Sequence, residues 1–169
     1  MENAYHQQLI DQACQYFKEY FGKIEAAFDR LTEAQVWQRP NEASNSMGNQ
    51  VLHLCGNIRQ YAISSLGQVE DTRERDSEFA AQEGFNKEEL LTKLKETVDE
   101  AIDVFEKLDE AELLRERHVQ AYHYTGLAVL IHVVEHFAYH TGQIVFWAKA
   151  LSNEGFDFYA DVDLNKKGE

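Results

Sequence analysis

The sequence predicts an all-α protein, a four-helix bundle in which the helices run up-down-down-up. Four long stretches carry apolar residues at helical spacing, and one long charged segment separates the second stretch from the third. A single proline and nine glycines in 169 residues leave little material for the many turns of a β-sandwich or barrel. The long connection allows the second and third helices to run in the same direction. We expect a single domain, residues 1–169, with one core.

The first two long helices are expected at about residues 3–31 and 46–66. Between them, Thr32 and Gln35 form a capping box for a short helical turn, because a threonine at the N-cap and a glutamine three residues later can satisfy each other's backbone donors. Gly67 follows the second helix and is the residue type that most often ends one.

The last two long helices are expected at about residues 87–108 and 126–151. The connection before the third helix, "GQVEDTRERDSEFAAQEGF", has no long apolar stripe, and its length is typical of a crossover or a functional loop. Asn86 with Glu89 predicts the start of the third helix, and Thr125 predicts the start of the fourth. The tail, "GFDFYADVDLNKKGE", is expected to be ordered only through its aromatic residues.

Charge and cysteine usage narrow the class of protein. The net charge is −14 and no cluster of Lys or Arg stands out, so neither nucleic acid nor an anionic membrane surface is an expected partner. No basic and apolar leader begins the chain, and no uncharged apolar run could span a bilayer. Cys14 and Cys55 form no CxxC motif. We therefore expect a cytoplasmic protein whose partner is a small molecule.

Three of the seven histidines repeat at intervals of four in the fourth helix: His132, His136 and His140. Residues four apart lie about 40° apart around a helix and about 6 Å apart along it, so two neighbours can share one metal ion. His132 and His140 are about 12 Å apart along the helix, so all three histidines cannot easily bind the same ion. An open metal site with three protein ligands therefore needs a histidine from another helix.

His53 is the only histidine in the middle of another predicted helix. It lies about 20 Å from the end of the second helix, which sits level with the start of the fourth if the two are antiparallel. His136 is then about 16 Å deep and His140 about 22 Å, whereas His132, at about 10 Å, is a full turn or more too shallow. The antiparallel topology therefore selects His53, His136 and His140, and a parallel pairing would select His132 instead.

The polar neighbours of these histidines are uncharged amides. Asn49, Gln50, Asn57 and Gln60 share the stripe of His53, and Gln143 accompanies the histidines of the fourth helix. An exposed stripe in so acidic a protein would be expected to carry Glu and Lys, so we expect this one to line a polar cleft. Asn57 and Gln143 are the candidates for orienting a substrate. The fourth helix is apolar nearly all round, which predicts that its other side packs against a second subunit.

The sequence contains two further features that could indicate catalysis. "HVVEH", from His132 to His136, matches the H-x-x-E-H pattern of inverted zinc proteases, with Glu135 as the base, but the pattern is short and those enzymes need a larger fold and a further acidic ligand. Nucleophilic catalysis by Cys55 is disfavoured, because it points about 160° away from His53 on the same helix. Single histidines in helices are also often ordinary core or boundary residues.

The segments "SNSMGNQVLHLCGNIRQY" and "HVVEHFAYHTGQI", with "RERDSEF" in the crossover and "GFDFY" in the tail, resemble the DinB-like superfamily over nearly the whole chain. The resemblance implies an up-down-down-up four-helix bundle, commonly dimeric. It also implies a divalent metal, often zinc or nickel, held by one histidine of the second helix and a His-x-x-x-His pair of the fourth. Carried onto this sequence, these ligands are His53, His136 and His140.

Members of the superfamily differ in function, so the resemblance leaves the reaction open. Some resemble S-transferases that use a low-molecular-weight thiol such as bacillithiol, mycothiol or glutathione, and others are described as metal-dependent hydrolases. The leading expectation is a transferase in which the metal lowers the pKa of a thiol. Water in the same position would become a nucleophile for hydrolysis. The remaining alternative is a non-enzymatic metal-binding or stress-response bundle, whose site would be closed by a fourth protein ligand.

Overall fold

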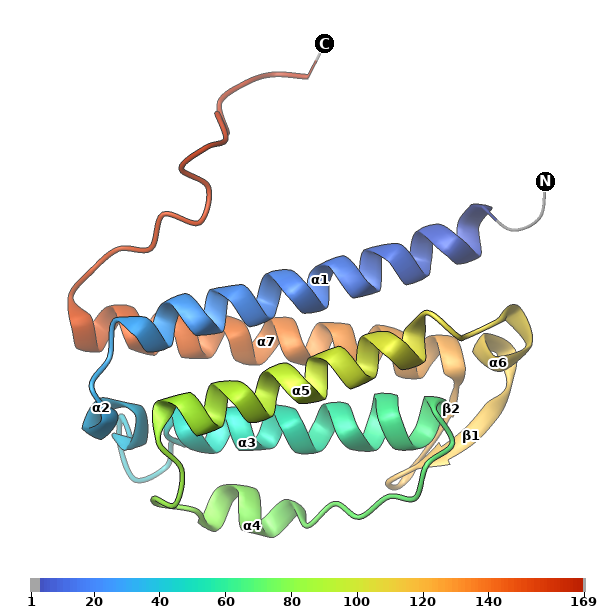
Figure 1. The fold of residues 1–169 in the computed structure, drawn as a ribbon, viewed down its shortest axis with the longest axis horizontal. Helices are drawn as coiled ribbons and strands as arrows, with labels where there is room; N and C mark the ends of the chain where they lie inside the picture. The colour runs from blue at the N-terminus through green and yellow to red at the C-terminus, as the bar shows by residue number, and fades with distance from the viewer. Residues whose placement is uncertain (1–3, 169) are drawn as a thin grey trace.

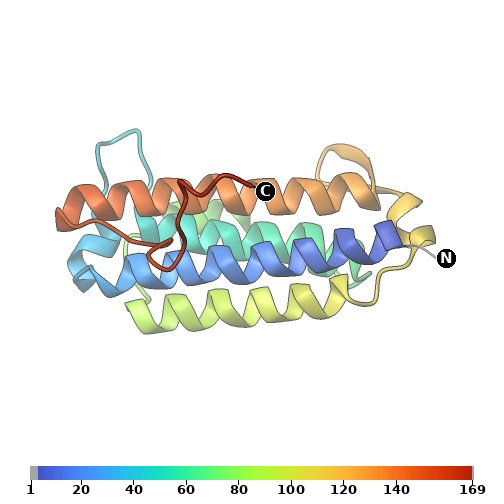
Figure 2. The same ribbon diagram turned by 90° about the horizontal axis from the view of Figure 1, so that it is seen from above.

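The computed structural model describes residues 4–168, and the chain in it is mostly helical, as predicted. Four long helical segments lie side by side along the molecule (Figures 1 and 2). Following the chain through Figure 1, α1 and α7 run in one direction, and α3 and α5 run in the other. The segments are α1 (Ala4–Asp29), α3 (Met47–Ile58) with its continuation η1 (Arg59–Leu66), α5 (Lys87–Phe105) and α7 (Gly126–Ser152).

Aromatic rings from three of these helices meet at the centre of the core. Phe17 of α1 packs edge-to-face against Phe105 of α5, with ring centroids 5.0 Å apart, and against Phe137 of α7, at 5.1 Å. All three rings are fully buried. Edge-to-face packing adds to the free energy gained from burying the rings. The core therefore ties α1 to α5 and α7, while α3 contributes Leu54 and Ile58, which are also fully buried.

The predicted starts of the short second helix and of the last three long helices are confirmed, whereas the predicted start of the first helix, at about residue 3, lies outside the described residues. A side-chain cap that accepts from a free backbone N–H removes one of the unpaired donors at a helix start. Reciprocal capping boxes begin α2 (Glu33–Trp37), α3 and α5, and a threonine cap begins α7. The residues are Thr32 with Gln35, Ser46 with Asn49, Asn86 with Glu89, and Thr125.

The end of the second long helix differs in detail from the prediction. Its last two turns, η1, are a π-helix, a form that is rare and often found at functional sites. Gly67 ends it with an ordinary φ of −80°, and the left-handed residue is Gln68, with φ 58°. A Cβ on Gly67 would lie 2.4 Å from the carbonyl oxygen of Ile63. Glycine is therefore required here by close backbone approach, and not by a left-handed conformation.

The charged crossover contains a short helix, α4 (Arg75–Ala80), that covers α3 (Figure 1). Glycine makes this close packing possible, because a Cβ on Gly56 of α3 would fall 1.8 Å from Oε1 of Glu78. Glu78 is 7% exposed although it lies in the most charged segment of the chain. The crossover is thus part of the packed structure and brings a buried carboxylate onto α3.

No helix or strand was predicted for the connection between α5 and α7, but the structure has both there. The connection forms α6 (Glu110–Leu114) and an antiparallel hairpin of β1 (Glu116–Val119) and β2 (Tyr122–Thr125), with His118 opposite His123. Arg117 of β1 is buried and donates to the carbonyl of Ser65 in η1. The hairpin is therefore held against the end of the second helix by tertiary contacts. No described helix is long and apolar enough to cross a membrane.

Candidate metal centre

Three histidines from two antiparallel helices come together between α3 and α7. His53 comes from α3, and His136 and His140 come from successive turns of α7. One ring nitrogen of each lies within 4.8 Å of one nitrogen of each of the others. The Nε2 atoms of His53 and His136 are 3.0 Å apart. These are the three residues that counting helix depth had selected, and in the described part of the chain they form the only such group of three or more potential ligands.

The cluster is electrostatically suited to bind a cation without competition from protons. Burial, and then the neighbouring imidazoles of His140 and His53, lower the pKa of His136 to about 3. Burial and His53 lower the pKa of His140 to about 4, against an opposing hydrogen bond with Gln143. Both side chains are therefore neutral near pH 7, and a neutral imidazole is the form that binds metals.

Glu78 of the crossover orients the ring of His53 by contacting its Nδ1 atom. Its Oε2 lies 3.0 Å from Nδ1 of His53, and a terminal nitrogen of Arg73 lies 3.2 Å from the same atom. Because an ionised carboxylate can only accept a hydrogen bond, we assign the proton to Nδ1, which leaves the lone pair of Nε2 for the other side of the ring. Arg73 holds the carboxylate through two hydrogen bonds, of 2.7 Å from Nε and 2.8 Å from a terminal nitrogen. Burial alone would raise the pKa of Glu78, but the hydrogen bonds from Arg73 and His53 lower it below its ordinary value. Glu78 is thus a charged partner for a histidine ligand.

Sequence reasoning did not find Glu78 or Arg73. Both lie in the segment 72–79, which includes the "RERDSEF" run noted for its resemblance, but no periodicity connects that run to His53. The one available indication was chemical: a histidine ligand usually donates its second ring N–H to a carboxylate or a carbonyl. That rule requires a partner without saying which of the thirty acidic residues it is.

The donor set fits a divalent transition metal. Two nitrogens bound at 2.0–2.1 Å to a tetrahedral ion are about 3.3 Å apart, which is close to the 3.0 Å between His53 and His136. Imidazole nitrogens suit zinc, nickel, copper and iron. Three protein ligands leave one tetrahedral position for a small molecule. The residues of this chain can therefore hold an ion of this class with an open coordination position.

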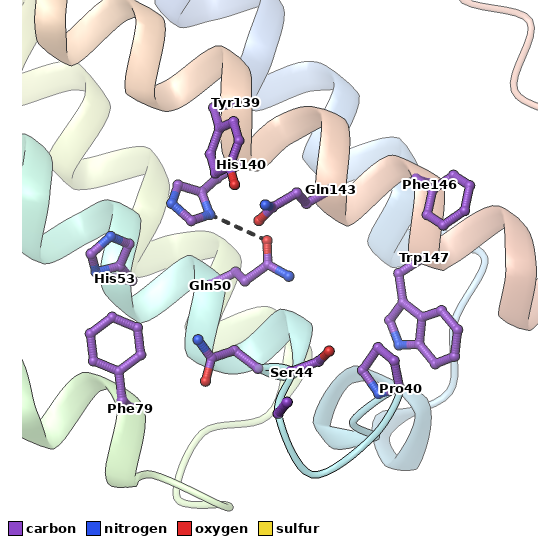
Figure 3. A pocket seen from close by; sticks show the side chains of 12 residues that line it. Pro40, Ser44, Gln50, His53, Phe79, Tyr139, His140, Gln143, Phe146 and Trp147 are labelled. Atoms are coloured by element: carbon purple, nitrogen blue, oxygen red, sulfur yellow. Dashed lines mark hydrogen bonds between the residues drawn. The ribbon is translucent and has the colours of Figure 1, made fainter.

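An open pocket of about 560 Å³ adjoins the cluster and reaches His53 and His140 (Figure 3). Gln50 of α3 and Gln143 of α7 line it, and Oε1 of Gln50 lies 3.4 Å from Nδ1 of His140. Gln143 is one of the two predicted substrate-orienting residues. The other, Asn57, is buried one turn after His53 on α3 and does not line this pocket. Its side-chain oxygen has no hydrogen-bond partner among the described residues.

The remaining candidates lie outside the cluster. His132 packs against the ring of Tyr61, with centroids 4.3 Å apart, and is not part of the three-histidine group. Glu135, the base required by the inverted protease motif, is exposed on α7. Cys55 is buried on the other side of α3, where burial raises the pKa of its thiol to about 12. The two alternatives therefore lack the geometry that their chemistry needs.

Comparison with known proteins agrees with this architecture. The structure is similar to that of a DinB-like protein from Bacillus subtilis, with a TM-score of 0.65 and 19% identity over 86% of this chain and 95% of that one. It is also similar to a conserved protein from Enterococcus faecalis, with a TM-score of 0.71 and 15% identity over 85% of this chain and 97% of that one. No curated protein sequence matches significantly. A family model described as a protein of unknown function, DUF1572, matches residues 4–160. The chain has a DinB-like fold and belongs to the DUF1572 family.

Proposed function

We propose that this protein is a metal-dependent S-transferase that joins a low-molecular-weight thiol to a small electrophilic substrate. One observation carries the proposal: three imidazoles, two with pKa values far below 7, converge beside an open pocket. His53, His136 and His140 would hold one divalent ion, zinc or nickel. An open site favours catalysis over a purely structural role, because structural sites are closed by a fourth protein ligand.

The chain's own residues have distinct roles in this proposal. The bound ion would lower the pKa of a thiol, so that the thiolate is available near neutral pH. The thiolate sulfur then forms a bond to the electrophilic carbon, the leaving group departs with its electron pair, and the thiol proton is released to solvent. Glu78 and Arg73 hold His53 in the orientation that leaves Nε2 free. Gln50 and Gln143 orient the substrate from the pocket wall.

Hydrolysis is the second candidate, and the openness of the pocket supports it. Water can reach His53 and His140 through the same opening as a thiol, and a three-histidine site supports either chemistry. The two functions differ in one requirement: an S-transferase needs a thiol and a hydrolase does not. A non-enzymatic metal-binding bundle is the third alternative, and it predicts no turnover with any substrate.

We further propose that the protein forms a homodimer through the outer face of α7. Ile131, Tyr139 and Phe146 are more than half exposed along α7. Tyr139 and Phe146 also line the pocket, so a partner subunit on this face would lie beside the pocket mouth. Sedimentation velocity of the wild type and of an Ile131→Glu variant tests this. A dimer that becomes a monomer in the variant supports the proposal, and a wild-type monomer contradicts it.

The experiment that tests the function is a turnover assay of the metal-loaded protein. A panel of haloaromatic and epoxide electrophiles is incubated with and without thiols, and the matched control is His123→Ala, which alters an exposed histidine of the hairpin. We expect thiol-dependent turnover that is lost in His136→Ala and retained in His123→Ala. Turnover that does not depend on thiol would favour the hydrolase, and no turnover would favour the non-enzymatic alternative.

A further inference from the structure

The wall of the pocket beside the histidines carries no permanent charge. Twelve residues line it, and in this described part of the chain none of them is Asp, Glu, Lys or Arg. These four types make up 27% of the sequence, so about three would be expected among twelve residues. The two lining histidines, His53 and His140, belong to the candidate metal centre. The pocket is therefore an uncharged region on a protein with a net charge of −14.

Aromatic rings lie at the two ends of the pocket, and amide side chains lie between them. In Figure 3, Phe79 lies at the His53 end, and Trp147 lies with Pro40 at the other end. Gln50 and Gln143 lie between these two groups, beside His140. A flat apolar group can stack against such rings, and the two amides offer both donors and acceptors for a polar group.

Three arginines close to the pocket interact with other residues of the protein and do not line it. Arg73 is bound to Glu78, and Arg39 donates to Oδ1 of Asn49 and to the carbonyl of Phe79. Arg75 stacks on the Phe79 ring, with its guanidinium carbon 4.8 Å from the ring centroid. None of the three lines the pocket. In the metal-free protein, a carboxylate or phosphate on a ligand would therefore lose its hydration without gaining an ion-pair partner from the pocket wall.

Moving an ionised group away from water is costly unless the protein supplies an opposite charge, whereas an amide or hydroxyl can be satisfied by the side chains present. We infer that this pocket binds an uncharged ligand with a flat apolar part and an amide, carbonyl or hydroxyl group. The inference rests on the proposed function, because it names the ligand class of the same site.

Three ligands of nearly the same shape test the inference: benzamide, which is neutral, benzoate, which is an anion, and benzamidine, which is a cation. Binding to the metal-free protein is measured by ligand-observed NMR titration at pH 7.5, so that benzoate cannot gain affinity from a metal. Fragments of this size bind in the millimolar range at best. We expect benzamide to bind at least about ten times more tightly than either ion, a difference of about 1.4 kcal/mol.

Introducing a positive charge into the pocket wall tests whether the three ligands bind in this pocket. Gln143→Lys should bring benzoate to at least the affinity of benzamide, and Ser44→Lys, on the loop side of the pocket, serves if that variant does not fold. Gln8→Lys adds the same charge on the exposed surface of α1 and should leave the order unchanged. The inference is overturned if wild-type protein binds either ion as tightly as benzamide, or if it shows no saturable binding of benzamide.

These measurements use no metal, so they separate the two proposals. Benzamide selectivity in a protein that takes up no metal would support the pocket and contradict the metal-dependent function. Metal uptake in a protein that prefers benzoate would support the metal centre and contradict the uncharged ligand class.

Discussion

Histidines approach one another in two regions of this molecule, and the two regions differ in what surrounds them. His118 and His123 face each other across the hairpin, with ring centroids 3.4 Å apart. His53 and His140 are less close, at 4.9 Å. Both hairpin histidines are exposed, however, and the described structure gives neither a carboxylate partner. His53 is 7% exposed and paired with Glu78.

Proximity of imidazoles is therefore a poor indicator of a metal centre by itself. A binding site also needs a third ligand and enough burial to keep the ligands neutral. The ring nitrogen that does not bind the metal needs a hydrogen-bond partner, which fixes the tautomer. The histidine cluster between α3 and α7 has all three, whereas the hairpin pair has none of them.

Removing the buried carboxylate should destabilise the protein strongly. Arg73 has a side chain only 3% exposed, and in Glu78→Ala it would keep Gln60 as a partner but lose its ion pair. Breaking a buried pair on one side costs about 3–5 kcal/mol. We expect a loss of this size in the free energy of unfolding, measured by urea denaturation. Glu116→Ala, on the exposed edge of the hairpin, should change it by less than about 0.5 kcal/mol.

A similar result for the two variants would contradict the role given to the Arg73–Glu78 pair. If Glu78→Ala fails to fold, the double variant Arg73→Leu with Glu78→Leu removes both charges together. Replacing both members of a buried pair by apolar residues is often neutral. Recovery of folding in the double variant would support the ion-pair account.

A conservative change at the same carboxylate should weaken metal binding. In Glu78→Gln the side chain keeps its shape but loses its negative charge, so His53 becomes a poorer ligand. Loss of such a partner typically lowers metal affinity by about 10–100-fold. Competition with a chromophoric zinc chelator measures the affinity. Glu135→Gln, exposed on α7 close to the cluster in sequence, is the matched control, and an equal loss in both variants would contradict the prediction.

The metal-free protein should lose stability when the pH falls from about 6.5 to 5. His136 and His140 have folded-state pKa values lowered to about 3 and about 4. An unfolded histidine has a pKa near 6.5, so the unfolded chain takes up protons first as the pH falls, and the stability present above that value is lost. We expect a loss on the order of 1 kcal/mol for each of the two histidines over this range. The window lies above the carboxylate range, so Glu78 does not contribute to it.

The dependence should shrink in His136→Gln and persist in His123→Gln, when the free energy of unfolding is measured at both pH values. A wild-type protein with the same stability at pH 6.5 and pH 5 would contradict the low pKa values of the cluster.

The smallest effect is expected at the hairpin itself. In His123→Ala the lost side chain is exposed and has no partner other than His118 among the described residues. Exposed substitutions of this kind change stability by less than about 0.5 kcal/mol. Metal content and chelator competition should match the wild type, and a loss of metal would show that the hairpin contributes to binding.

The sequence was most informative where helix geometry is regular. A rise of 1.5 Å per residue places His53 between His136 and His140, and capping residues such as Asn86 and Thr125 mark where the helices begin. The amide stripe next to His53 was expected to face a polar cleft, and Gln50 does line the pocket, while Asn49 is used to hold the crossover through the carbonyls of Glu78 and Ala81.

The features that were missed depend on contacts between distant segments. Glu78 is 25 residues from His53 and lies in a stretch without periodicity, so only the fold brings the two together. The hairpin has strands of four residues, too short for a reliable alternating pattern, and one of its anchors is the buried contact of Arg117 with Ser65. The role of Gly67 could not be predicted for the same reason. Its φ is ordinary, and glycine is needed because the carbonyl of Ile63, one turn away, leaves no room for a Cβ.

We propose that the three histidines between α3 and α7 hold one divalent metal ion. Elemental mass spectrometry of protein purified without chelators or affinity-tag metals tests it most directly, on the wild type, His136→Ala and His123→Ala. We predict about one divalent ion per chain in the wild type and in His123→Ala, and none in His136→Ala. A wild type that contains no metal, and takes up neither zinc nor nickel when they are added, would contradict the claim.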